Sequence, residues 1–130
     1  MKPLLFILMG FIHLLTNANP NKPAYIIFNN VGEIATYEDI VTSSLQNELI
    51  FFGELHNNPI AHWLQLELTR DLYFADTTSV LRLGFEMFEA DQQVLLDEYA
   101  AGYLSTANFE RETRLWNNYK TDYKPLVEFG

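Results

Sequence analysis

The chain has 130 residues, of which 48% are hydrophobic and 15% aromatic, a composition typical of one folded domain. Its 17 acidic and 8 basic residues give a formal net charge of −9, and such a surface repels the phosphates of nucleic acids. We therefore exclude a nucleic-acid partner. Cysteine is absent, which excludes disulfides, thiolate metal ligands and the lipid-acceptor residue of a bacterial lipoprotein.

The first 18 residues have the features of a secretory signal peptide. Lys2 is followed by the apolar run "PLLFILMGFIHLL", and the small residues Thr16 and Ala18 suit a cleavage site. The run is short for a transmembrane helix, which needs about 20 apolar residues. An uncleaved N-terminal anchor is the alternative. We expect an exported protein, in the periplasm or at the cell surface, whose folded part is residues 19–130.

A hairpin and a short helix are predicted next. "AYIIF" (24–28) predicts a strand, "NNVGE" a turn and "EIAT" a second strand. Thr36, with Asp39 three residues later, predicts an N-cap and a weaker form of the capping box for a helix that ends near Leu45. The continuous apolar run "ELIFFG" (48–53) then predicts a strand buried on both faces.

A longer helix follows. Pro59 suits its first turn, and Asn57 or Asn58 can cap it. Leucine or isoleucine recurs every four residues from Ile60 to Leu72, which predicts one apolar stripe on a helix that ends near residue 74. "VLRLGFEMF" (80–88) predicts another strand. The order strand, helix, strand favours a parallel βαβ unit.

Only helices are predicted after Asp91. One begins there and ends near Gly102, a second covers residues 107–119 with Asn108 as its cap, and Pro125 opens a third. Two parallel strands alone do not make a covered sheet. The predicted fold class is therefore α/β, with a parallel sheet, flanking helices and a smaller helical lobe, truncated at the C-terminus. A small α+β domain is the alternative.

Acidic residues follow both predicted strands of the parallel sheet. Gly53, Glu54 and His56 follow the first strand, and Glu86 lies near the end of the second. In open α/β sheets ligands bind beyond the carboxyl ends of the strands, so we expect these side chains to share a crevice. Carboxylate and imidazole together can hold a divalent metal or move a proton. Glu54, His56 and Glu86 are therefore candidate metal ligands.

Other residues near this crevice allow both functional and structural roles. His62 lies in the first turn of the long helix, off its apolar stripe, so burial in the core is not required of it. It can equally be an exposed residue, and Glu54 or Glu86 can simply pair with Arg82. The aromatic residues of the later helices are mostly expected in the core. They would also suit a flat apolar ligand, and a tyrosine can ligate haem iron.

Three segments resemble a known family in their order and spacing. "FFGELHNNPIAHWLQLEL", "LGFEMFEADQQVLLDEY" and "LWNNYKTDYKPL" are similar to the ChaN-like haem-binding bacterial proteins linked to iron uptake, which are related to the Tiki and erythromycin-esterase proteins. The resemblance extends from about Ala24 to the last residue. The positions that match the family's motifs are Gly53, Glu54, His56, Asn58, Pro59, His62, Gln65, Glu86, Met87, Phe88, Asp91, Gln93, Trp116, Asp122, Tyr123 and Pro125.

The resemblance implies a larger α/β domain that binds haem through a protein side chain on iron. His56, His62 and Tyr123 are the candidate haem-binding residues. A homodimer and contact with membrane-associated uptake machinery are left open. Family chains are considerably longer, and their second half carries further strands and another histidine-bearing motif. A complete site in these 130 residues is therefore in question.

Three functions compete. The first is haem binding in the periplasm or at the cell surface for iron acquisition, without catalysis. The second is a hydrolase of the Tiki and erythromycin-esterase type, in which His56 or Glu86 activates water and Glu54 holds a metal or orients the imidazole. The third is a small interaction module without a ligand, which leaves the acidic residues after the two predicted strands unexplained.

Overall fold

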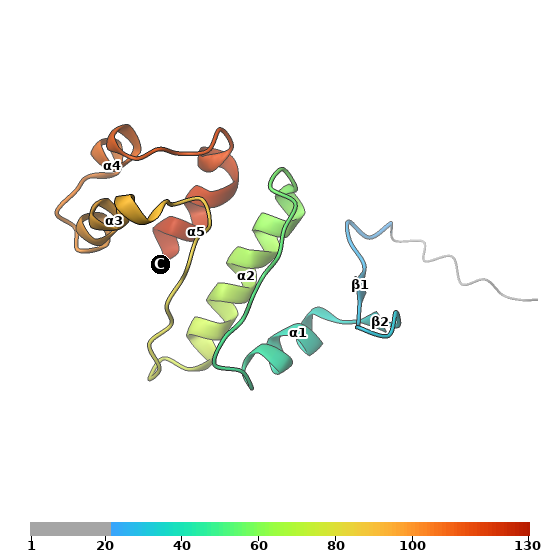
Figure 1. The fold of residues 1–130 in the computed structure, drawn as a ribbon. Coiled ribbons are helices and arrows are strands. Elements are labelled where there is room, and N and C mark those ends of the chain that lie inside the picture. Colours follow the sequence, from blue (N-terminus) through green and yellow to red (C-terminus); the bar gives the residue numbers. More distant parts are fainter. Residues whose placement is uncertain (1–21) are drawn as a thin grey trace, which may run out of the picture.

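The computed structural model describes residues 22–130, which are mostly helical (Figure 1). The elements are β1 (Ile27–Phe28), β2 (Ile34–Ala35), α1 (Tyr37–Ser44), α2 (Pro59–Ala75), the 3-10 helix η1 (Ala90–Gln92), α3 (Gln93–Ala100), α4 (Thr106–Glu112), the π-helix η2 (Tyr119–Tyr123) and α5 (Lys124–Phe129). Helix α2 lies between the β1–β2 hairpin with α1 and a helical lobe of α3, α4 and α5. Within this part of the chain no helix is long and apolar enough to cross a membrane. The predicted signal peptide lies outside the described residues.

The predicted hairpin is confirmed. β1 and β2 pair antiparallel, with Phe28 opposite Ile34. Asn29 closes the turn, because its side-chain oxygen accepts hydrogen bonds from two backbone N–H groups of the turn at 3.0 and 2.9 Å. Gly32 has φ of 83°, a left-handed conformation that glycine adopts without a steric penalty.

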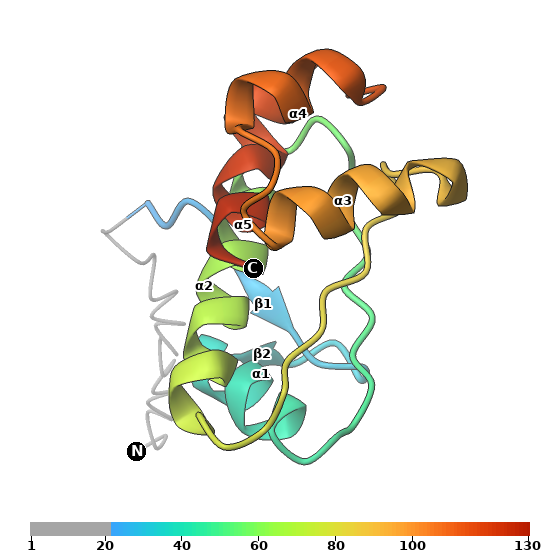
Figure 2. The same cartoon turned by 90° about the vertical axis from the view of Figure 1, so that its left-hand side faces the viewer.

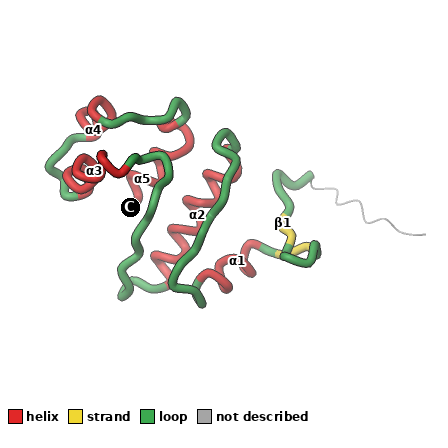
Figure 3. Tube along the Cα trace, viewed as in Figure 1, coloured by secondary structure: helices red, strands yellow, loops and turns green. Residues whose placement is uncertain are grey.

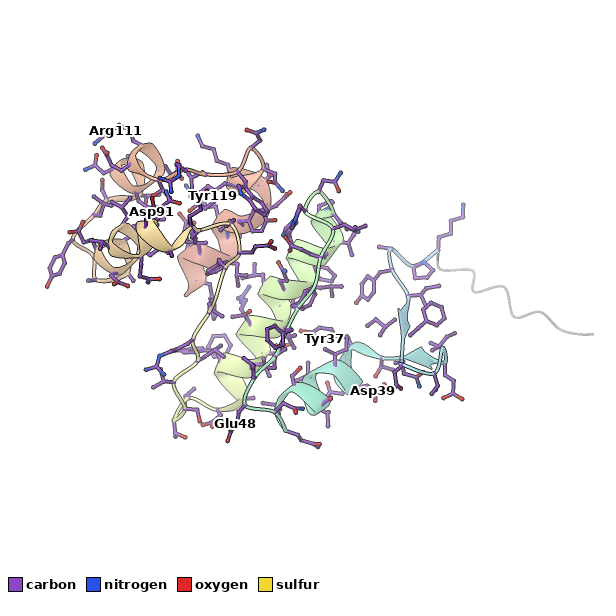
Figure 4. The ribbon with its side chains drawn as sticks, in the orientation of Figure 1. Tyr37, Asp39, Glu48, Asp91, Arg111 and Tyr119 are labelled. Atoms are coloured by element: carbon purple, nitrogen blue, oxygen red, sulfur yellow. The ribbon has the colours of Figure 1, made fainter. Side chains whose placement is uncertain are left out.

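The predicted cap of α1 is also confirmed. The Thr36 hydroxyl accepts from the Asp39 N–H, and the Asp39 carboxylate accepts from the Thr36 N–H at 2.8 Å. The two hydrogen bonds make a full capping box. Tyr37, in the first turn, donates its hydroxyl to the Asp71 carboxylate of α2 at 2.8 Å (Figure 4). This contact joins α1 to the C-terminal half of the longer helix.

Helix α2 begins as the sequence predicts. Asn58 is its N-cap, and the side-chain oxygen accepts from the N–H of Ile60 at 3.0 Å and of Ala61 at 3.3 Å. Pro59 occupies the first turn, where its missing N–H costs nothing. Of the predicted apolar stripe, Leu68 is the member that becomes fully buried.

The predicted parallel sheet is wrong for the described residues, whose one sheet is the β1–β2 hairpin. Residues 48–53 and 80–86 do run in the same direction along α2, and a second view turned by 90° shows the same course (Figure 2). Both are loops, however, and no backbone hydrogen bond joins them (Figure 3). A strand exists only through its ladder to a neighbour, and these segments lie on opposite sides of a hollow. Their apolar side chains are therefore left exposed, with Phe51 at 88%.

The helical lobe differs from its prediction in detail. Ser105, and not Asn108, caps α4, because the Ser105 hydroxyl accepts from the Asn108 N–H at 3.3 Å. The predicted helix 107–119 ends at Glu112, since Thr113 adopts an extended conformation. The helix predicted to begin at Asp91 starts as η1 and continues as α3. Pro125 lies in the first turn of α5, as predicted.

Aromatic side chains form the core of this lobe. Phe109 is completely buried and stacks on Tyr99, with ring centroids 4.3 Å apart. Phe88 meets Phe109 edge-on at 5.9 Å, and Tyr119 is almost fully buried beside them (Figure 4). The same cluster includes Tyr123, so the core of the lobe continues directly into the site described below.

The Asn58→Ala substitution should lower the free energy of unfolding by about 1 kcal/mol, because it leaves the first N–H groups of α2 without their acceptor. Urea denaturation measures the change. The matched control is Asn57→Ala, since Asn57 is an exposed neighbour whose side chain makes no hydrogen bond among the described residues. Equal losses for both variants would contradict the cap.

Candidate functional site

A hollow of about 910 Å³ lies between the two extended segments and one face of α2. Residues 48–54 and 80–87 line two of its sides, and Trp116, Tyr123 and Leu126 contribute from the helical lobe. Glu54, His56 and Glu86 all line it. The three residues predicted to share a crevice therefore do share one, although no ladder joins the segments that carry them.

Glu54 is the centre of the polar network at this hollow. Its side chain is only 10% exposed. Oε1 accepts a hydrogen bond from the Tyr123 hydroxyl and lies 3.4 Å from His56 Nδ1. Oε2 lies 3.1 Å from His62 Nδ1. A carboxylate withdrawn from water needs compensating partners. Oε1 has two hydrogen-bonding partners, whereas Oε2 lies close to His62 but accepts no hydrogen bond within the described residues.

His62 is buried, with 4% of its surface exposed, so the alternative of an exposed first-turn residue is wrong. Its Nε2 donates to the His56 carbonyl at 3.1 Å, and its Nδ1 faces Glu54 Oε2 and, at 3.3 Å, Gln65 Oε1. The imidazole ring also packs edge-on against Tyr123, with centroids 4.4 Å apart. Both ring nitrogens are thus engaged by the protein, which makes His62 a structural member of the site.

His56 differs from His62 in exposure and in its contacts. Its side chain is 55% exposed and lies against the Trp116 ring, with centroids 4.7 Å apart. Its backbone carbonyl accepts from both His62 Nε2 and Asn118 Nδ2, which fixes the loop. Its Nδ1 faces Glu54, and no described group makes a hydrogen bond to its Nε2. His56 is therefore the imidazole that can bind a ligand in the hollow.

Tyr123 is 6% exposed and lies at the end of the π-helix η2. Burial, followed by the hydrogen bond to the Glu54 carboxylate, raises the pKa of the Tyr123 phenol above its ordinary value. The hydroxyl therefore stays protonated and donates to Glu54. The π-helix itself is a rare conformation that often marks functional sites.

The structure does not pair Glu86 with Arg82. Both residues line the hollow, but no ion pair between them exists within residues 22–130. In the same residues no group of three histidine, aspartate or glutamate side chains is placed to hold a metal ion. The proposed divalent metal at Glu54, His56 and Glu86 therefore gains no support from the described geometry.

Asn118 is a site residue that sequence reasoning missed. Its side-chain amide donates to the His56 carbonyl, 62 residues away, and to the Asp122 carboxylate at 2.8 Å. Asp122 in turn lies 3.9 Å from His62 Nε2. No local pattern marks Asn118, because its role comes entirely from the approach of η2 to the loop at residue 56.

Comparison with known proteins identifies the family of this chain. A family model described as haem-binding uptake, Tiki superfamily, ChaN matches residues 40–130. The chain belongs to this family. No curated protein and no solved structure matches the chain. The resemblance noted from three sequence segments is confirmed, and every residue of the network around Glu54 lies within the matched range.

The free energy of unfolding should fall at alkaline pH, because the buried Tyr123 phenol has a raised pKa. Because the pKa of its phenol is raised in the folded protein, the stability it contributes is complete below the ordinary value of 10.0 and is lost as pH rises above it. Urea denaturation between neutral pH and about pH 11, together with tyrosinate absorbance, measures this loss. The Tyr123→Phe substitution should reduce this alkaline loss of stability. The Tyr103→Phe substitution should leave it unchanged, since Tyr103 is 85% exposed. Identical profiles for the two variants would contradict the burial of the phenol.

Proposed function

We propose that this protein binds haem and serves iron acquisition in the periplasm or at the cell surface. Membership of a family described by haem-binding uptake supports the ligand. The observation that carries the proposal is the pairing of a large hollow with one available imidazole at its wall. Export rests on the apolar N-terminal run alone, and a homodimer and contact with uptake machinery remain predictions.

The donor set of the site fits haem. A volume of about 910 Å³ lies within the usual range of ligand pockets, roughly 300–1,000 Å³. Leucine, phenylalanine and tryptophan side chains make up much of the wall, which suits a flat apolar ring. Histidine is a common axial ligand of haem iron. Bound haem would supply an iron centre that takes one such imidazole.

Among the three candidates His56 is the residue that suits iron. His62 is buried with both nitrogens engaged. Tyr123 donates a hydrogen bond to Glu54, and ligation through the phenolate would require the hydroxyl proton to leave. His56 lines the hollow, and its Nδ1 contact with Glu54 leaves Nε2 for the metal. His62 and Tyr123 then serve to hold His56 and Glu54 in place.

A haem titration followed by absorption spectroscopy tests the proposal. The wild-type protein should give a saturable, red-shifted Soret band, and His56→Ala should alter that band and weaken haem binding on the order of tenfold, equal to about 1.4 kcal/mol. Added imidazole should restore the band by replacing the missing ligand.

The control is Asn57→Ala, which changes the same exposed loop without touching the network around Glu54. A wild-type band and affinity in His56→Ala would rule out His56 as the iron ligand. If Tyr123→Phe alone changed the band, the ligand would be the phenol. No saturable band in the wild type would contradict haem binding by this chain.

Arg82 is the one arginine or lysine among the described residues that line the hollow, and haem carries two carboxylates. Arg82→Gln should weaken haem binding several-fold and reduce its dependence on salt, while the position of the Soret band stays unchanged. Arg111→Gln is the control, because Arg111 lies in the outer part of the lobe, paired with Glu112 (Figure 4). An equal effect of the two substitutions would show that Arg82 acts only through net charge.

Hydrolysis is the second candidate, and one contact favours it. A carboxylate on Nδ1 of an exposed imidazole is the arrangement of a general base, which Glu54 and His56 provide. Hydrolysis of a chromogenic ester that is lost in His56→Ala, in a protein without a saturable haem band, would place this function first.

A further inference from the structure

One carboxylate serves both imidazoles of the site. Glu54 uses Oε2 toward His62 and Oε1 toward His56, and Oε1 also accepts the Tyr123 hydroxyl. These groups come from the loop after residue 53, the first turn of α2 and the π-helix η2. With only 10% of its side chain exposed, Glu54 acts on its neighbours with little screening by water.

The contact with Glu54 selects one tautomer of His56. An ionised carboxylate only accepts hydrogen bonds, so the proton of the neutral imidazole lies on Nδ1 and the lone pair on Nε2. The backbone of His56 is held as well, because its carbonyl accepts from both His62 and Asn118. The main chain of His56 is thus held by two hydrogen bonds, and Glu54 and Trp116 contact its ring.

Resting on the proposed function, we infer that Glu54 is a positioning residue that makes this site bind ferric haem in preference to ferrous haem. A carboxylate on the far nitrogen of a metal-bound histidine orients the ring and raises its basicity. A more basic imidazole and a nearby negative charge both stabilise the higher charge of ferric iron. Glu54 acts through His56 and does not touch the iron.

Tyr123 limits this effect. Its hydroxyl occupies the same Oε1 atom that faces His56 Nδ1, and it competes for the negative charge of that oxygen. Removing the hydroxyl leaves Oε1 to His56 alone. Substitutions at Glu54 and at Tyr123 should therefore change the ferric preference in opposite directions, which a merely structural role of either residue does not predict.

The experiment compares the affinities for ferric and ferrous haem, and the midpoint potential of the complex, in wild type and variants of the full chain. Glu54→Gln removes the charge at nearly constant shape, and should lower the ratio of ferric to ferrous affinity about tenfold, which corresponds to a rise of about 59 mV in the potential. Tyr123→Phe should raise the ratio and lower the potential. Tyr103→Phe, an exposed phenol in the helical lobe, should leave both unchanged.

The outcomes separate this inference from the proposed function. Loss of the haem band in His56→Ala with an unchanged affinity ratio in Glu54→Gln would overturn the role of Glu54 and leave haem binding intact. A wild-type band in His56→Ala would overturn the ligand and, with it, the inference. If the Glu54→Gln variant does not fold, the midpoint potential of the Tyr123→Phe complex tests the inference instead. A potential above the wild-type value would overturn the inference.

Discussion

The burial of the Glu54 carboxylate is the constraint on which the site depends. Withdrawing a carboxylate from water costs far more than a typical contact returns unless hydrogen bonds and opposite charge compensate it. Its partners are side chains of the neighbouring loop, of α2 and of η2, and Tyr123 lies 69 residues further along the chain. The hydrogen bond from Tyr123 to Glu54 therefore joins the helical lobe to the loop that precedes α2.

The same constraint separates the roles of two histidines only six residues apart. His62 becomes buried because Glu54 and the His56 carbonyl engage its two nitrogens. His56 shares Glu54 through Nδ1 but keeps its ring at the wall of the hollow, against Trp116. One histidine thus holds the loop, and the other leaves its Nε2 without a hydrogen bond among the described residues.

In the hollow, residues from the ends of two separate segments lie together, as they do in an α/β site. The parallel sheet that was expected to bring them together is absent from the described residues. Residues 48–54 and 80–87 run in the same direction along α2, so the residues at their ends reach the same place even though no ladder joins the segments. Residues at the ends of two neighbouring segments lie close together whenever the segments share a direction, as they do at the strand ends of an open α/β sheet. Exposed apolar side chains such as Phe51 follow from the same lack of pairing.

The sequence by itself determined the local structure and the identity of the chemical groups. The Thr36 and Asn58 caps, the hairpin turn and the place of Pro125 in the first turn of α5 were all predictable, because each depends on residues within four positions of one another. Three motif segments were enough to indicate the family. Glu54, His56 and Glu86, which the segments contain, line one hollow. Only the tertiary structure decided three features. The apolar runs do not pair as strands, His62 is buried, and Asn118 holds the His56 carbonyl. These features depend on contacts between distant segments, whose geometry no local pattern of residues encodes.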